Sequence, residues 1–158
     1  MSPDAFAWLR GLSGGKGGDA SAPEAGDARA VSVADMVRLG WITDLQAEEA
    51  SKALDELKAV IQKSGWKLTP QFRKEAVVFG APDAKVPFVI TFRKGQVGFF
   101  ICVEGIEDPV AVAEIPREFT EELGGGRYRG LVLGGRGANL QRYVSVLANS
   151  VRFGKCIE

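Results

Sequence analysis

Histidine is absent from this 158-residue chain. It is the side chain whose ordinary pKa allows proton exchange near neutral pH, and it is the commonest protein ligand of transition metals. Its absence excludes Ser-His and Cys-His nucleophilic catalysis and imidazole zinc sites. Carboxylate, lysine, tyrosine and lone-thiol chemistry stay open, but no motif selects among them. We therefore expect a protein that is not an enzyme, with no catalytic residue, no metal site and no cofactor.

Cysteine is scarce as well, with Cys102 and Cys156 as the only two. Their positions match neither a metal-ligand spacing nor a disulfide framework. We expect two free thiols, Cys102 buried in a strand and Cys156 accessible after the last regular element. The corresponding prediction is a reducing, cytoplasmic location. We also expect no secretory signal and no membrane span, since the sequence contains no apolar run of the about 18 residues that a span needs.

The chain has no net charge either, because 20 basic residues balance 20 acidic ones. A neutral chain creates no overall field that would attract nucleic acid. The predicted helix after Thr43 is acidic, and its Glu48, Glu49 and Glu56 would repel a phosphate backbone. We therefore expect no nucleic-acid ligand, and a partner that is another protein or a second copy of this chain.

Composition divides the chain into three parts. Residues 1–12 are a short apolar and aromatic peptide, which we interpret as a docking segment. Residues 13–30 are rich in glycine and alanine and contain no large apolar side chain, as is typical of a flexible linker. Residues 31–158 contain the periodic apolar patterns and are predicted to form a single α+β domain, which we expect to fold without residues 1–30.

The proposed docking segment carries Phe6, Trp8 and Leu9. Large apolar side chains on a flexible peptide gain little free energy unless they pack on another surface. Three alternatives stay open: the segment docks on the domain of its own chain, it docks on a partner, or it is a simple unstructured end.

Helix signals are clearest near the start of the domain. Ser32 predicts the N-cap of a short helix through Leu39. Thr43 and Gln46 form a capping box that predicts a second helix ending at Gly65. The second helix has the spacing of an amphipathic helix in its apolar residues, which are Ala50, Ala53, Leu54, Leu57, Val60 and Ile61.

Beyond this helix the apolar period changes to that of strands. The predicted strands are 66–73, 75–80, 87–92, 97–103 and 127–133, with 110–115 as a further candidate and Pro70 indicating an edge position. A short helix is predicted over 116–123, and a last helix carries Leu140, Tyr143, Val144, Leu147 and Val151 on one side. The expected fold class is α+β: a largely antiparallel sheet of about five strands with two long and one or two short helices packed on it.

A glycine-rich turn precedes the last predicted helix and is the best candidate for a ligand site. Strand-turn-helix geometry offers backbone N–H groups at the positive end of a helix, and an arginine adds a charge-assisted contact to phosphate. The turn lacks the lysine and hydroxyl of a P-loop. The candidate anion-binding residues are Gly134, Gly135, Arg136, Gly137 and Asn139. The alternative is that the turn only connects a strand to a helix.

Two function classes follow. The order of elements resembles that of small α/β-sandwich chaperones of secretion systems, and this resemblance implies a non-enzymatic role. We predict a protein–protein interaction or chaperone-like accessory module with a tethered N-terminal docking segment. The alternative is a protein that binds phosphate, a nucleotide or acyl-coenzyme A at the 134–139 turn, or a transferase. Arg136 and its flanking glycines resemble part of the pyrophosphate loop of N-acetyltransferases, which implies the acyl-transfer version of this alternative.

Overall fold

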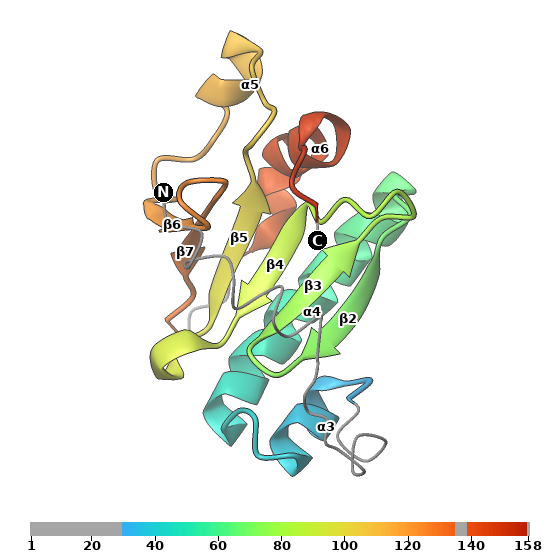
Figure 1. The fold of residues 1–158 in the computed structure, drawn as a ribbon, viewed down its shortest axis with the longest axis vertical. Coiled ribbons are helices and arrows are strands. Elements are labelled where there is room, and N and C mark those ends of the chain that lie inside the picture. Colours follow the sequence, from blue (N-terminus) through green and yellow to red (C-terminus); the bar gives the residue numbers. More distant parts are fainter. Residues whose placement is uncertain (1–29, 135–138, 158) are drawn as a thin grey trace.

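The computed structural model describes residues 30–134 and 139–157. They contain one antiparallel sheet of six strands in the order β2-β3-β4-β5-β7-β6, and four α-helices (Figure 1). The strands are β2 (Thr69–Arg73), β3 (Ala76–Gly80), β4 (Phe88–Thr91), β5 (Gly98–Cys102), β6 (Glu121–Leu123) and β7 (Tyr128–Val132). The predicted α+β class is confirmed, with one strand more than the expected five. Pro70 lies in β2, an edge strand, as predicted.

The helices are α3 (Val33–Arg38), α4 (Asp44–Ser64), α5 (Pro109–Ala113) and α6 (Val144–Phe153). Both predicted N-caps are confirmed. Ser32 Oγ accepts a hydrogen bond from the Asp35 N–H at 3.2 Å. Thr43 Oγ1 accepts from the Gln46 N–H at 3.1 Å, and Gln46 Oε1 accepts from the Thr43 N–H at 2.9 Å, which completes the capping box. Within the two described ranges no helix combines the length and apolar character that a bilayer crossing requires.

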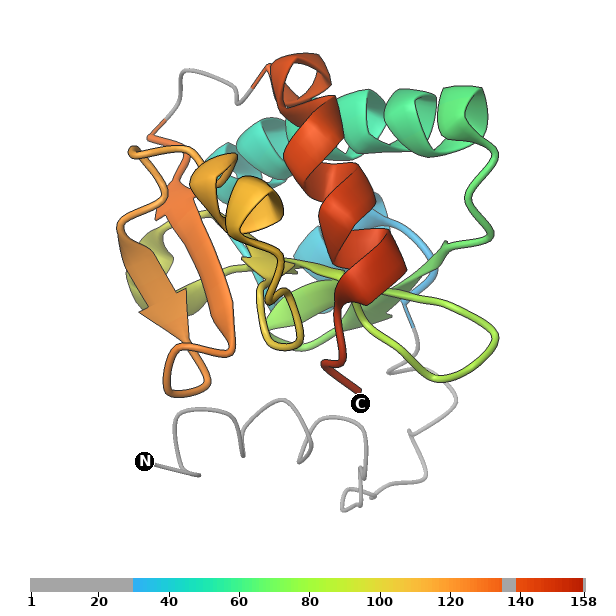
Figure 2. The same ribbon diagram turned by 90° about the horizontal axis from the view of Figure 1, so that it is seen from above.

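The first face of the sheet, as we name it, lies against α4 and α6, which are on the same side of the sheet (Figure 2). Phe88 and Ile90 of β4 and Phe99 and Ile101 of β5 are fully buried there. They pack in one cluster with the apolar side of α4, whose predicted core residues are all buried. The amphipathic helix therefore covers the sheet as its sequence indicates.

The alternate strand residues form the second face of the sheet. Cross-strand pairing joins Val78, Val89 and Phe100 in one row, and Cys102 and Tyr128 in the next. They belong to a separate buried cluster that contains no residue of α3, α4, α5 or α6. Both faces of the central β4–β5 hairpin are thus buried, as the doubly apolar pattern predicts.

Two predicted elements between β5 and β7 are wrong. Residues 110–115 were expected in a strand, but most of them lie in α5, because the Asp108 side chain accepts from the Val110 N–H at 3.0 Å and a proline occupies the first helical position. Residues 116–123 were expected in a helix, but they form a turn followed by β6. This arrangement buries Phe119 in the core and pairs β6 with β7.

The last predicted helix is confirmed, but one of the residues expected on its apolar side, Val144, is exposed and Val146 is buried instead. It begins with a 3₁₀ turn, Leu140–Tyr143, before α6. A 3₁₀ turn has three residues per turn, so it changes the phase of the residues that follow. Val146 is buried in consequence, whereas Val144 is 39% exposed.

The prediction of two free cysteines is wrong. Cys102 and Cys156 form a disulfide, and Cys156 is 1% exposed instead of accessible. After α6 the chain returns to the sheet, where the Val86 N–H donates to the Cys156 carbonyl at 2.8 Å. A Cβ at Gly154 would lie 2.4 Å from the Ser150 carbonyl oxygen, so glycine permits this return. The separation of 54 residues between the cysteines conceals their proximity in space.

Candidate functional site

A cleft of about 610 Å³ lies beside α5 and the β6–β7 hairpin. Figure 1 shows α5 at one end of the fold, standing away from the sheet. The cleft lining mixes apolar side chains with polar and charged ones. The apolar lining residues are Val103, Ile106, Val112, Ile115, Pro116 and Phe119, and the charged ones are Arg117, Glu122 and Arg129.

Three contacts hold the segment between α5 and β6 against the C-terminal helix. Glu114 Oε1 accepts from Asn149 Nδ2 at 2.8 Å. Glu118 Oε2 accepts from the Tyr143 hydroxyl at 2.6 Å. The Phe119 ring meets the Tyr143 ring edge-on, with 5.0 Å between their centroids. One wall of the cleft is therefore fixed by the core and does not depend on a ligand for its shape.

Electrostatics stabilise the same wall. The hydrogen bond from Tyr143 lowers the pKa of Glu118, and burial together with Glu118 raises the pKa of Tyr143. Both shifts favour an ionised carboxylate that accepts from a protonated hydroxyl. Arg142 Nη2 lies 3.8 Å from Glu118 Oε2 and adds a weak surface attraction. This pair therefore holds the wall in place and is not poised to exchange a proton near neutral pH.

Two apolar side chains of α5 are exposed. Val110 is 67% exposed and Val112 is 45% exposed, although both lie in a helix of only five residues. Single exposed apolar residues are normal on a protein surface. These two differ because Val112 also lines the cleft, so they continue its apolar lining onto the outside. We call Val110, Val112 and the cleft lining the α5 surface.

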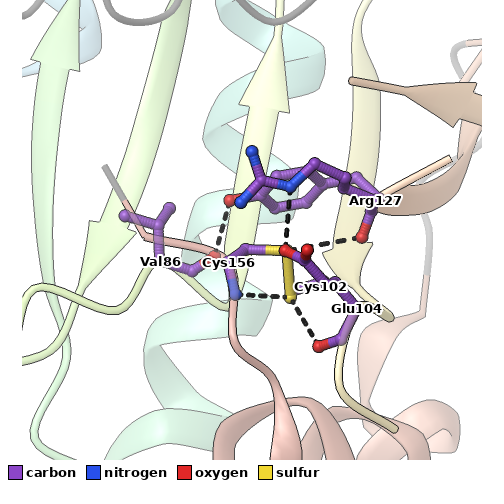
Figure 3. Close-up of polar contacts among 6 residues, drawn as sticks. Val86, Cys102, Glu104, Arg127 and Cys156 are labelled. Atoms are coloured by element: carbon purple, nitrogen blue, oxygen red, sulfur yellow. Dashed lines mark hydrogen bonds and ion pairs between the residues drawn. A yellow bond between two sulfur atoms is a disulfide. The ribbon is translucent and has the colours of Figure 1, made fainter. Parts of the chain in front are cut away.

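The disulfide defines a second candidate site, at the end of β5 (Figure 3). The Cys156 N–H donates to Cys102 Sγ at 3.1 Å, and Arg127 Nε donates to Glu104 Oε1 at 2.8 Å. Cys102 Sγ lies 3.6 Å from the Glu104 carbonyl oxygen, and Cys156 Sγ lies 3.4 Å from that of Arg127. Each sulfur thus has an acceptor within reach if the bond is reduced. Because both cysteines are buried, we interpret the bond as a tie that holds the C-terminal segment on the sheet.

The glycine-rich turn is only partly described. Gly134 has φ +64°, and Asn139 has φ +51° just before the 3₁₀ turn. The Leu140 N–H donates to Glu56 Oε1 at 2.7 Å, so a carboxylate of the protein already occupies one donor that an anion would use. Gly135, Arg136 and Gly137 lie outside the described residues, and the anion site stays a prediction.

The other predicted site residues, Phe6, Trp8 and Leu9, also lie outside the described residues. In the described parts of the chain no group of three or more metal-ligating side chains comes together. The buried polar side chains there include Gln46, whose Nε2 donates to the Phe92 carbonyl at 3.2 Å, and Ser150, whose Oγ donates to the Cys102 carbonyl at 2.8 Å. Both serve packing between elements.

Comparison with known proteins finds no family model, no curated protein and no solved structure that matches this chain.

Sequence reasoning missed the α5 surface. Its signal is local: Asp108 and Pro109 are a helix start, so the following valine-alanine alternation lies on a helix and does not place both valines on one side of a strand. Assigning residues 110–115 to a strand missed the helix and its exposed valines. Nothing in the sequence alone brings Phe119 and Arg129 beside them, because β6 and β7 create that proximity.

Proposed function

We propose that this protein is a non-enzymatic protein-binding module and that the α5 surface is where it contacts its partner. The observation that carries the proposal is the exposure of Val110 and Val112 next to a cleft that is lined by both apolar and charged side chains. Apolar surface that is exposed next to a preformed groove is typical of interaction sites. The module also carries the tethered N-terminal docking segment, residues 1–12, and the α5 surface is a contact site separate from it.

The charges at the cleft indicate the chemistry of the partner. Arg117 and Arg129 line the cleft together with Glu122, and Arg129 Nη2 is 3.8 Å from Glu122 Oε2. A partner segment with apolar side chains and one carboxylate fits this lining. The valines and the apolar lining bury the apolar groups, and the arginines, which outnumber the acid, receive the carboxylate. A second copy of this chain is the simplest protein that could supply such a segment.

The sequence-based prediction of a cytoplasmic location stays a prediction, and the disulfide makes it testable. Cytosolic thiols are kept reduced, whereas disulfides persist in oxidising compartments. The state of Cys102 and Cys156 in protein taken directly from its own cells, trapped with an alkylating reagent in denaturant so that the buried thiols are reached, therefore reports the compartment. Alkylation of both cysteines without prior reduction would support the cytoplasm.

Photo-crosslinking tests the proposed contact. A photoreactive amino acid replaces Val112 in the full chain, and the matched control replaces Leu45, which is 74% exposed on α4. We expect a discrete crosslinked protein product at position 112 that is absent at position 45. Val110→Lys should reduce that product at least about tenfold. It should change the free energy of unfolding by no more than about 0.5 kcal/mol, as surface substitutions usually do. Equal products at both positions, or none at 112, would contradict the proposal.

A further inference from the structure

The second face of the sheet is buried although the described chain covers only part of it. Ala76, Val78 and Val89 are 0% exposed, and Phe100 is 7% exposed. The four helices contribute nothing to this cluster, and α4 and α6 lie on the opposite side of the sheet (Figure 2). An apolar sheet face that is open to water would leave these side chains exposed. Something therefore lies across them.

The described cover is confined to one end of this face. The C-terminal segment reaches it through Cys156, which is bonded to Cys102 and accepts at its carbonyl from the Val86 N–H at 2.8 Å. Cys102 pairs with Tyr128 in the row next to Phe100. The row of Val78, Val89 and Phe100, and the row of Ala76 and Thr91 beyond it, lie further along the strands. Among the described residues, the members of this cluster outside the strands are Val86 and Cys156.

The surface that needs a cover is flat and apolar. Gly98 and Gly130 carry no side chain, and an added Cβ at Gly98 would lie 2.8 Å from Cε1 of Phe100, so the ring lies over this glycine. Gly130 is the cross-strand partner of Phe100, so no side chain stands beside the Phe100 ring on β7. At the edge, Nη1 of the Arg73 guanidinium is buried, and that burial lowers its pKa. The cover therefore extends from the middle of the sheet to β2.

The chain enters the described structure at the edge of this face. Ala30 forms an antiparallel bridge with Phe72 in β2, so it lies one strand position beyond the sheet. Four strand spacings separate that position from β5, or about 19 Å. The eighteen residues of the 13–30 linker have a root-mean-square reach of about 23 Å if flexible. The linker length thus matches the distance from the edge to the middle of the face, where an intramolecular contact is most favoured.

We propose that residues 1–12 dock in cis on the second face of the sheet, with Phe6, Trp8 and Leu9 packed over Val78, Val89 and Phe100. The segment supplies large apolar side chains that cover the face, and the linker holds them at a high effective concentration. Each large apolar side chain buried there gains free energy that a free peptide cannot. Among the alternatives for this segment, docking on its own domain is therefore the one that accounts for the burial.

Hydroxyl-radical footprinting of the full chain tests this proposal. Phe100 faces the second side and Phe99 the first, so adjacent residues of one type act as probe and control. In the unaltered protein both should resist oxidation at all protein concentrations. In the combined variant Phe6→Ser, Trp8→Ser, Leu9→Ser, oxidation of Phe100 should rise at least about fivefold, while oxidation of Phe99 stays constant.

Two results would overturn the proposal. Phe100 that stays protected in the variant would show that another part of the chain covers the face. Protection that is lost on dilution of the unaltered protein would show that a second copy supplies the cover. If the variant unfolds and both rings are oxidised, the fluorescence of Trp8 decides. Subtracting the emission spectrum of the Trp8→Phe variant from that of the unaltered protein gives the emission of Trp8. In the monomer this emission should be blue-shifted and should resist quenching by acrylamide. An exposed Trp8 would rule out docking.

Discussion

The two faces of the sheet are both buried, but their covers differ in kind. The first face packs under α4, a 21-residue helix with a capping box, and under α6. The second face has an end tied down by a disulfide and a middle that no described helix covers. A helix that covers a sheet has apolar residues at helical spacing in the sequence. A segment without regular structure that covers a sheet shows no such spacing. The comparison teaches that strand patterns can reveal a buried face before its cover can be identified.

The largest expected difference between the faces comes from truncating the two adjacent phenylalanines. Phe99→Ala should lower the free energy of unfolding by about 3–5 kcal/mol, because Phe88 and Phe119 hold their positions around the cavity. Phe100→Ala should cost less, about 1–3 kcal/mol, because an irregular cover collapses more easily into the space. Chemical denaturation of both variants measures the two values. Equal losses would mean that the two covers are equally rigid.

Removing the disulfide should weaken the second face by a comparable or smaller amount. A cross-link between residues 54 apart restricts the unfolded chain, and loops of this length typically contribute about 2–4 kcal/mol. We expect the double variant Cys102→Ala, Cys156→Ala to lose stability in that range. A reductant should lower the melting temperature of the unaltered protein and leave that of the double variant constant. If it lowers both equally, the bond does not stabilise the fold.

Much of the first face could be predicted from the sequence, because its signals are local. Thr43, Gln46 and Gly65 mark the ends of α4 through hydrogen bonds within one turn. The β4–β5 hairpin is recognisable because its strands are apolar on both sides and its connection contains a glycine. The α+β class then follows from the order of these elements.

The segment between β5 and β7 could not be predicted in the same way, because tertiary contacts decide it. Residues 116–123 have good helix signals at both ends, but Phe119 reaches the aromatic cluster of the first face only if the segment is not helical. The disulfide also depends on tertiary structure, since the C-terminal segment reaches Cys102 only when α6 is packed on the sheet. The candidate α5 surface depends on the first of these, because Phe119 lines the cleft.

The smallest effect concerns the rim of the first face, where Tyr143 donates to Glu118. The pKa of Glu118 is lowered in the folded state, so this contact contributes stability above the ordinary pKa of 4.5 and loses it as the pH falls through the folded value. The pKa of Tyr143 is raised, so its contribution is present below 10 and is lost as the pH rises beyond that. Tyr143→Phe should lower the melting temperature only slightly at neutral pH, because the contact is near the surface.

The pH profile distinguishes this contact from simple packing at the same rim. Tyr143→Phe keeps the ring against Phe119 and removes only the hydroxyl. The difference in melting temperature between the variant and the unaltered protein should therefore be largest near neutral pH and should shrink towards both pH 3 and pH 11, which lie roughly one unit beyond the ordinary pKa values of the two groups. A second-face variant such as Phe100→Ala carries no titrating group and should show a loss that is independent of pH. A flat difference for Tyr143→Phe would mean that the hydroxyl contributes through packing alone, and that the wall of the cleft is held by Phe119 and Glu114 without the ionised Glu118.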